Sequence, residues 1–122
     1  MKRFYVVLLG LWCAFCLVGC KGPAFNGRLE MHGDRFYLDY AEFTGIQTHQ
    51  MLLHESSVIN VVIESVSGHI DIYVTDSRGA VLYQGNDADS SQFVLVVPRT
   101  DTYFFKVAGK KAKGSVLFQV RK

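Results

Sequence analysis

The chain has 122 residues, of which 13 are lysine or arginine and 11 are aspartate or glutamate. Lys2 and Arg3 account for the excess of positive charge, so the remainder is formally neutral and lacks the basic stripe expected of a nucleic-acid-binding domain. The length after residue 19 suits a single domain that buries a core without metal or disulfide bonds.

The first 20 residues have the layout of a secretory signal peptide. Lys2 and Arg3 precede an apolar run over residues 4–15, and Gly19 lies directly before Cys20. The run is too short and wrongly flanked for a membrane-spanning helix, and it matches the apolar region of a cleaved signal peptide. We therefore predict a helical signal peptide over residues 1–19.

The ending LVGC, residues 17–20, resembles the lipobox of bacterial lipoproteins. The resemblance implies that Cys20 carries diacylglycerol on its sulfur, becomes the first residue after cleavage and is acylated on nitrogen, for example with palmitate. Two or three acyl chains would anchor the protein permanently, since each buried methylene contributes about 0.8 kcal/mol. The expected location is the bacterial cell envelope, facing the periplasm or the exterior. The alternative is an ordinary signal peptide with a chance cysteine.

Cysteine chemistry is not expected in the mature domain. Cys13 and Cys16 lie inside the predicted signal peptide, and Cys20 is the predicted lipidation site. No thiol then remains for a disulfide bond, a thiolate metal site or a cysteine nucleophile.

Residues 20–34 combine Gly-Pro, Asn-Gly and His-Gly pairs with few regularly spaced apolar residues. This composition predicts a lipidated cysteine followed by an irregular tether. Over residues 35–122 the hydrophobic period is two, which is typical of strands, and no convincing 3.6-residue period is present. We therefore place the folded domain at residues 35–122.

Short apolar runs separated by glycine-rich or polar turns predict about eight strands and an all-β, antiparallel, jelly-roll-like β-sandwich. The run Gln92–Val97 is apolar on both faces, which predicts a central position in its sheet. The expected strands lie at residues 36–40, 46–54, 58–64, 69–75, 80–83, 92–97, 102–107 and 115–121.

Two segments resemble the bacterial pre-peptidase C-terminal domain. Ser67–Val74 is similar to the family's sG-x-x-D-h-Y-h segment, and residues 102–109 with 114–120 are similar to its G-x-Y-x-h-x-V … G-x-Y-x-L-x-V ending. Asp101-Thr102 stands in place of the usual glycine, and Leu117-Phe118 in place of the last tyrosine. The resemblance covers about half the chain, and other jelly-roll modules, such as the Golgi-dynamics type, are similar too. It implies a jelly-roll β-sandwich without catalytic residues, usually an accessory or binding module.

Aromatic residues provide the first candidate site. Strand alternation points Tyr37, Tyr73 and Phe104 away from the expected core. Outward aromatic side chains on adjacent strands would form a face that stacks on sugars or binds a protein. The alternative is that loops or the opposite edge of the sandwich cover them.

A polar loop provides the second candidate site. Asn86, Asp87 and Asp89 offer alternating oxygen ligands of the kind calcium prefers. The run lacks the glycine and distal glutamate of the helical calcium loop, and a plain solvated loop is the alternative. Calcium is the only cofactor that the sequence suggests, and the histidine spacing supports no zinc site.

No catalytic residues are predicted. The sequence lacks a Gly-x-Ser-x-Gly elbow, a zinc-protease helix motif and an evident pair of carboxylates. The leading hypothesis is a lipid-anchored, non-enzymatic binding module for a protein or glycan. The alternatives are a structural component of an envelope assembly and, more remotely, a hydrolase whose site is assembled in space. An exposed aromatic cluster would favour binding, whereas a long unpaired sheet edge would favour assembly.

Overall fold

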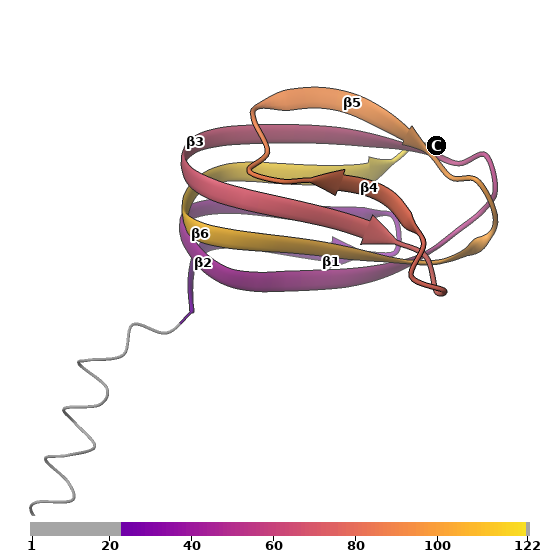
Figure 1. The fold of residues 1–122 in the computed structure, drawn as a ribbon, viewed down its shortest axis with the longest axis horizontal. Helices are drawn as coiled ribbons and strands as arrows, with labels where there is room; N and C mark the ends of the chain where they lie inside the picture. The colour runs from indigo at the N-terminus through magenta and orange to yellow at the C-terminus, as the bar shows by residue number, and fades with distance from the viewer. Residues whose placement is uncertain (1–22, 122) are drawn as a thin grey trace, which may run out of the picture.

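The computed structural model describes residues 23–121, which form six antiparallel strands in one open sheet (Figure 1). The strands are β1 (Ala24–His32), β2 (Arg35–Leu53), β3 (Val58–Thr75), β4 (Val81–Gly85), β5 (Ser91–Val96) and β6 (Asp101–Val120). Their order in the sheet is β1-β2-β6-β3-β4, and β5 also pairs with β3. This part of the chain contains no helix able to span a membrane. The predicted signal peptide and Cys20 lie outside the described residues.

The predicted all-β antiparallel class is confirmed, but the strands are fewer and longer than expected. Three pairs of expected short strands are each continuous, as β2, β3 and β6. The stretches between them, which the sequence predicts as turns, remain extended because neighbouring strands keep pairing through them. One open sheet therefore replaces the predicted jelly-roll-like sandwich of eight strands.

The three long strands bend near their middles, so that the sheet folds over on itself (Figure 1). Register irregularities occur at these bends, for example between Tyr40 and Gly45 in β2 and between Ser65 and His69 in β3. Such bulges increase local twist and allow a strand to turn a corner. Gly68 has a φ of 73°, and a Cβ atom there would overlap the carbonyl oxygen of Lys111. Only glycine fits this corner.

The bends divide the sheet into two halves. The β5 half-sheet contains β1, β5 and the adjoining segments 35–40 of β2, 58–65 of β3 and 114–120 of β6. The β4 half-sheet contains β4 and segments 45–53 of β2, 69–75 of β3 and 101–109 of β6. Each half-sheet has one inner face toward the core and one outer face.

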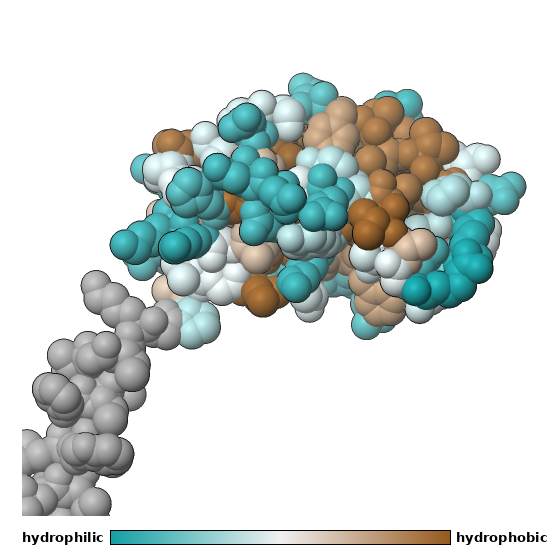
Figure 2. Space-filling view, in the orientation of Figure 1, coloured by the Kyte–Doolittle hydropathy of each residue, from teal (hydrophilic) through white to brown (hydrophobic). Residues whose placement is uncertain are grey.

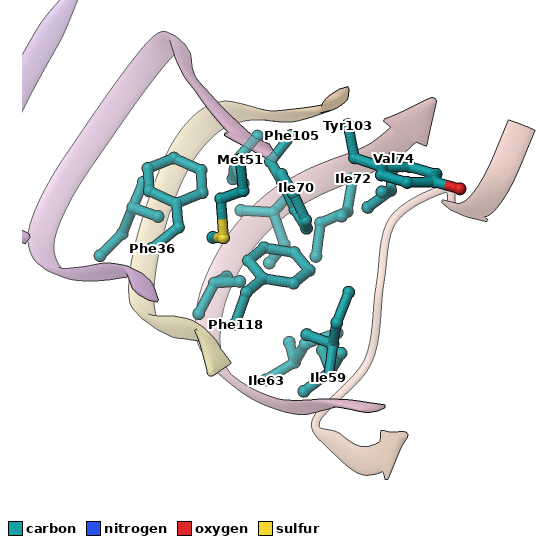
Figure 3. Close-up of a cluster of buried hydrophobic side chains, with 14 of the residues drawn as sticks. Phe36, Met51, Ile59, Ile63, Ile70, Ile72, Val74, Tyr103, Phe105 and Phe118 are labelled. Carbon is teal, nitrogen blue, oxygen red and sulfur yellow. The ribbon is translucent and has the colours of Figure 1, made fainter. Parts of the chain in front are cut away.

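The inner faces form the hydrophobic core (Figure 3). Phe118 of the β5 half-sheet stacks on Phe36 with ring centroids 6.0 Å apart. It also meets Phe105 of the β4 half-sheet edge-on at 5.0 Å. Strand alternation predicts inward side chains at Phe36, Leu38, Tyr40, Ile70, Ile72, Val74, Tyr103, Phe105, Val107, Val116, Phe118 and Val120. All of them are buried except Val120, which is partly buried against the core.

Two expected elements take different positions. Residues 24–32, predicted as tether, form β1, which pairs with β2 from Ala24↔Thr44 to His32↔Arg35. Most β1 side chains are exposed, so the strand is held by backbone hydrogen bonds and has no apolar alternation to reveal it. The strand at Gln92–Val97 was predicted as central, but β5 pairs only with β3 and forms an edge.

Tyr40 carries an unusual buried hydroxyl group. Its side chain is 2% exposed, and the hydroxyl has no hydrogen-bond partner among the described residues. Burial, helped by the charge of Asp39, raises the pKa of Tyr40 to about 12. A buried polar group without a partner opposes folding, because the unfolded state hydrates it.

Replacing Tyr40 with phenylalanine is expected to raise the free energy of unfolding at pH 7 by about 1 kcal/mol. The native pKa lies above the ordinary value of 10.0, so the unfolded tyrosine ionises first as pH rises. Wild-type stability should therefore fall between about pH 10 and pH 12, and the variant should lack this part of the loss. Urea unfolding at pH 7 and between pH 10 and pH 12 tests this prediction. Tyr37→Phe, on an outer face, is the control. Equal or lower stability of Tyr40→Phe would contradict the prediction.

Candidate functional site

The three aromatic residues predicted to share a binding face are divided between two faces. Tyr73 of β3 and Phe104 of β6 lie on the outer face of the β4 half-sheet, where Thr75 pairs with Phe104 and Tyr73 with Lys106. Tyr37 lies on the outer face of the β5 half-sheet, paired with Leu117, with the Arg35 guanidinium 5.1 Å from its ring centroid. The structure therefore brings two of the three together.

Tyr73 and Phe104 line a groove of about 490 Å³ on the outer face of the β4 half-sheet. Cross-strand pairing places Phe104 between Gln50 and Thr75, and Lys106 between Thr48 and Tyr73. The side chains that project into the groove from this face belong to Thr48, Gln50, Tyr73, Thr75, Phe104 and Lys106.

The chemistry of the groove is aromatic with a polar rim. Phe104 is 38% exposed, and the Lys106 ammonium lies 5.6 Å from the centroid of the Tyr73 ring. Lys106 is the only lysine, arginine, aspartate or glutamate among the groove residues. The floor of the groove is apolar, and hydroxyl, amide and ammonium groups flank it. Such a groove suits a ligand in which an apolar or planar group lies next to a neutral polar group or an anionic group.

The loop predicted as a candidate calcium site lies next to this face. The Asn86 side-chain oxygen accepts hydrogen bonds from the Tyr73 hydroxyl and from the Gln84 amide, both at 3.3 Å. These bonds link the loop to the aromatic residue of the groove. No three histidine, aspartate or glutamate side chains within residues 23–121 come together as a metal site. Calcium binding by Asn86, Asp87 and Asp89 stays a prediction.

Asp87 of the same loop forms a pair with a histidine. Its carboxylate lies 2.7 Å from His69 Nδ1, and its backbone amide donates to the Asp71 carboxylate at 2.7 Å. The side chains of His69 and Asp87 are 64% and 67% exposed. In the described part of the chain no serine hydroxyl is hydrogen-bonded to His69. The pair attaches the loop to β3 and lies on open surface, not in a cleft.

An ionic cluster that no sequence motif signals joins two loops at the end of the molecule away from the bends. Arg99 Nη2 lies 3.3 Å from the Asp76 carboxylate and donates to the Asp101 carboxylate at 2.9 Å. The Ser77 hydroxyl donates to Asp101 at 2.8 Å. These contacts connect the β3–β4 turn to the first residue of β6 and to the loop before it. The cluster therefore supports the fold.

The carboxyl groups of this cluster favour their ionised forms. Burial works to raise the pKa of Asp76, but hydrogen bonds from the Ala80 and Arg78 amides and the charges of Arg99 and Arg78 outweigh it, so the pKa is lowered. The pKa of Asp101 is lowered chiefly by the Ser77 hydroxyl, with help from backbone amides and Arg99. Both groups are therefore charged at neutral pH and hold the two loops together.

Comparison with known proteins shows that the fold of this chain is similar to that of solved structures. No family model and no curated protein sequence matches the chain, so the resemblance to the pre-peptidase C-terminal family gains no support. PliG of Aeromonas hydrophila, a periplasmic lysozyme inhibitor of g-type lysozyme, is similar in structure with a TM-score of 0.54 and 12% identity, over 80% of this chain and 95% of that one. PliG of Salmonella Typhimurium gives a TM-score of 0.43 and 16% identity, over 83% and 100% of the two chains.

Proposed function

We propose that this protein is an extracytoplasmic, lipid-anchored and non-enzymatic inhibitor that binds a lysozyme, with a g-type lysozyme as the first candidate. The observation that carries the proposal is the exposed Tyr73–Phe104 groove on a fold similar to that of Aeromonas hydrophila PliG. The groove presents recognition groups without an arrangement for catalysis. Tyrosine is one of the residue types enriched among the few residues that supply most of the binding energy at protein interfaces.

The predicted location supports an encounter with such an enzyme. A signal peptide and an acylated Cys20 would place the domain in the cell envelope, and the Aeromonas hydrophila PliG is itself periplasmic. Because β1 begins at Ala24, only three residues separate Cys20 from the sheet, so the chain takes four residue steps from Cys20 to Ala24. At about 3.3–3.6 Å per residue they reach at most about 14 Å, so an anchored domain would lie directly on its membrane.

Replacing Phe104 with alanine is expected to weaken lysozyme inhibition about tenfold or more, because an aromatic group at the centre of an interface commonly contributes over 1 kcal/mol. The measurement is the inhibition constant of the full chain against g-type lysozyme acting on a cell-wall suspension. Leu52→Ala is the matched control, since Leu52 is an exposed apolar residue on the same half-sheet that does not line the groove.

Two results would count against the proposal. Failure of the wild-type chain to bind or inhibit g-type or other lysozymes would refute the partner, and equal effects of Phe104→Ala and Leu52→Ala would refute the groove. Titration with soluble cell-wall glycan fragments tests the glycan alternative. Glycan binding that is lost in Phe104→Ala, without inhibition of any lysozyme, would make the protein a glycan-binding module.

A structural role in an envelope assembly is the second candidate function. The observation in its favour is the open edge of β5, which pairs with β3 on one side only. Such an edge offers backbone hydrogen bonds to another chain. This role is compatible with the first, because β5 and the groove belong to different half-sheets.

A further inference from the structure

The free edge of β5 has a defined hydrogen-bonding pattern. The Val97 amide donates to the Ser57 carbonyl, and the Arg121 amide on the opposite side of β3 donates to the Val58 carbonyl. Backbone groups in an antiparallel ladder alternate in direction along each strand. The backbone N–H and C=O groups of Val58 therefore point toward β6. Those of its partner on β5, Val96, point away from β3. By the same alternation Val94 and Gln92 also direct their N–H and C=O groups to the open side.

β5 lacks the features that usually protect an edge strand. The edge strand β1 carries Arg28 and Glu30 and a register irregularity at Asn26/Gly27, and β4 has only five residues. β5 contains no charged residue and no proline, and its register with β3 is regular. Charges, bulges and short length are the common means of preventing edge-to-edge pairing. Among the edges that the structure describes, β5 is the one open to another strand.

The side chains next to this edge are also apolar. Val94 and Val96 are 49% and 57% exposed on the outer face of the β5 half-sheet. Val58 and Val62 of β3 lie beside them and are half-buried. Figure 2 shows hydrophobic surface gathered at the upper right, where β5 ends. A partner at the edge would therefore cover valine side chains in addition to forming backbone hydrogen bonds.

We propose that β5 pairs antiparallel with β5 of a second copy of this chain, about a two-fold axis at Val94. In this register Val94 lies opposite the partner's Val94, and Gln92 lies opposite the partner's Val96. The outward backbone groups at 92, 94 and 96 are spaced symmetrically about residue 94, so each facing pair exchanges two hydrogen bonds.

A second copy fits this edge for two further reasons. The strand has no charge, so pairing with itself brings no like charges together. The two-fold arrangement uses both β5 edges and is closed, which prevents growth into fibres. A three-residue pairing with a few valines is smaller than a standard interface and makes a reversible dimer. Attachment of both copies to one membrane would raise their effective concentration.

Crosslinking tests the proposed register in the full chain expressed in its envelope. The described residues contain no cysteine, so Val94→Cys introduces one defined thiol there. A short bifunctional thiol reagent should then give a covalent homodimer, because facing residues have Cα atoms about 5.5 Å apart. The wild-type chain shows any background from Cys20. Val66→Cys is the control, since Val66 is 67% exposed and lies at the bend of β3, away from β5.

A charge exchange tests self-pairing independently. Val94→Lys or Val94→Glu places like charges opposite each other, and each should weaken the dimer roughly fivefold. Co-expression of the two variants should restore it as a mixed dimer, which a merely misfolded variant could not do. Equal crosslinking of Val94→Cys and Val66→Cys, or no recovery in the mixture, would overturn the inference. These outcomes do not depend on lysozyme binding, which Phe104→Ala tests separately.

Discussion

Replacing Phe118 with alanine is expected to lower the free energy of unfolding by about 3–5 kcal/mol. Phe118 is fully buried and contacts Phe36 in its own half-sheet and Phe105 in the other. Its removal would leave a cavity where the two half-sheets meet, and the surrounding strands cannot collapse into it because their backbones are paired on both sides. Urea unfolding followed by fluorescence or circular dichroism measures the loss.

Leu117→Ala is the neighbouring control. Leu117 is on the same strand, half-buried on the outer face, and does not belong to the core. Its replacement should cost much less than that of Phe118, because an outer-face side chain loses less buried apolar area. If both variants lose similar stability, the contact between the half-sheets is not what holds the fold.

Replacing Gly68 with alanine is expected to destabilise the protein by about 3 kcal/mol or more, because strain and overlap add at this position. The residue has positive φ, and its new Cβ would overlap the backbone carbonyl of Lys111 on β6. The overlap involves backbone on both sides, so no side-chain rotation can relieve it. The corner of β3 would have to open, which would pull the half-sheets apart.

Gly79→Ala separates the cost of the positive φ at Gly68 from the cost of the steric overlap there. Gly79 has a similar φ of 85°, but a Cβ atom there would meet nothing within 4 Å. Its replacement should therefore cost only the conformational penalty of about 1–2 kcal/mol. The difference between the two variants in urea unfolding reports the overlap at the corner. Identical losses would show that Gly68 is needed for its φ alone.

Strand alternation predicted a large part of the core. The pattern at Ile70, Ile72 and Val74 identified the inner face of β3, and Tyr103 and Phe105 identified that of β6. These assignments succeed because the side-chain period of a strand is a local property of the backbone. The same logic correctly placed Tyr73 and Phe104 outside the core.

Only part of the candidate site could be predicted from the sequence. Tyr37 has the same outward pattern as Tyr73, yet the bends in the long strands carry it to the other outer face. Thr48, Gln50 and Lys106 were not identified, because they join the groove through pairing between residues far apart in the chain. No local signal distinguishes these polar residues from any other exposed position of a strand.

The amino-acid sequence by itself determined the all-β class and the inward side chains of the alternating segments, since both depend on a period of two along the chain. It also carries the signal-peptide pattern and Cys20, from which anchoring is predicted. Only the tertiary structure decided that six strands form one folded sheet, that residues 24–32 join it, and that β5 lies at an edge. These features depend on which strands pair and where glycine corners bend them. Pairing is a property of backbone groups that every residue carries, so composition reveals it poorly.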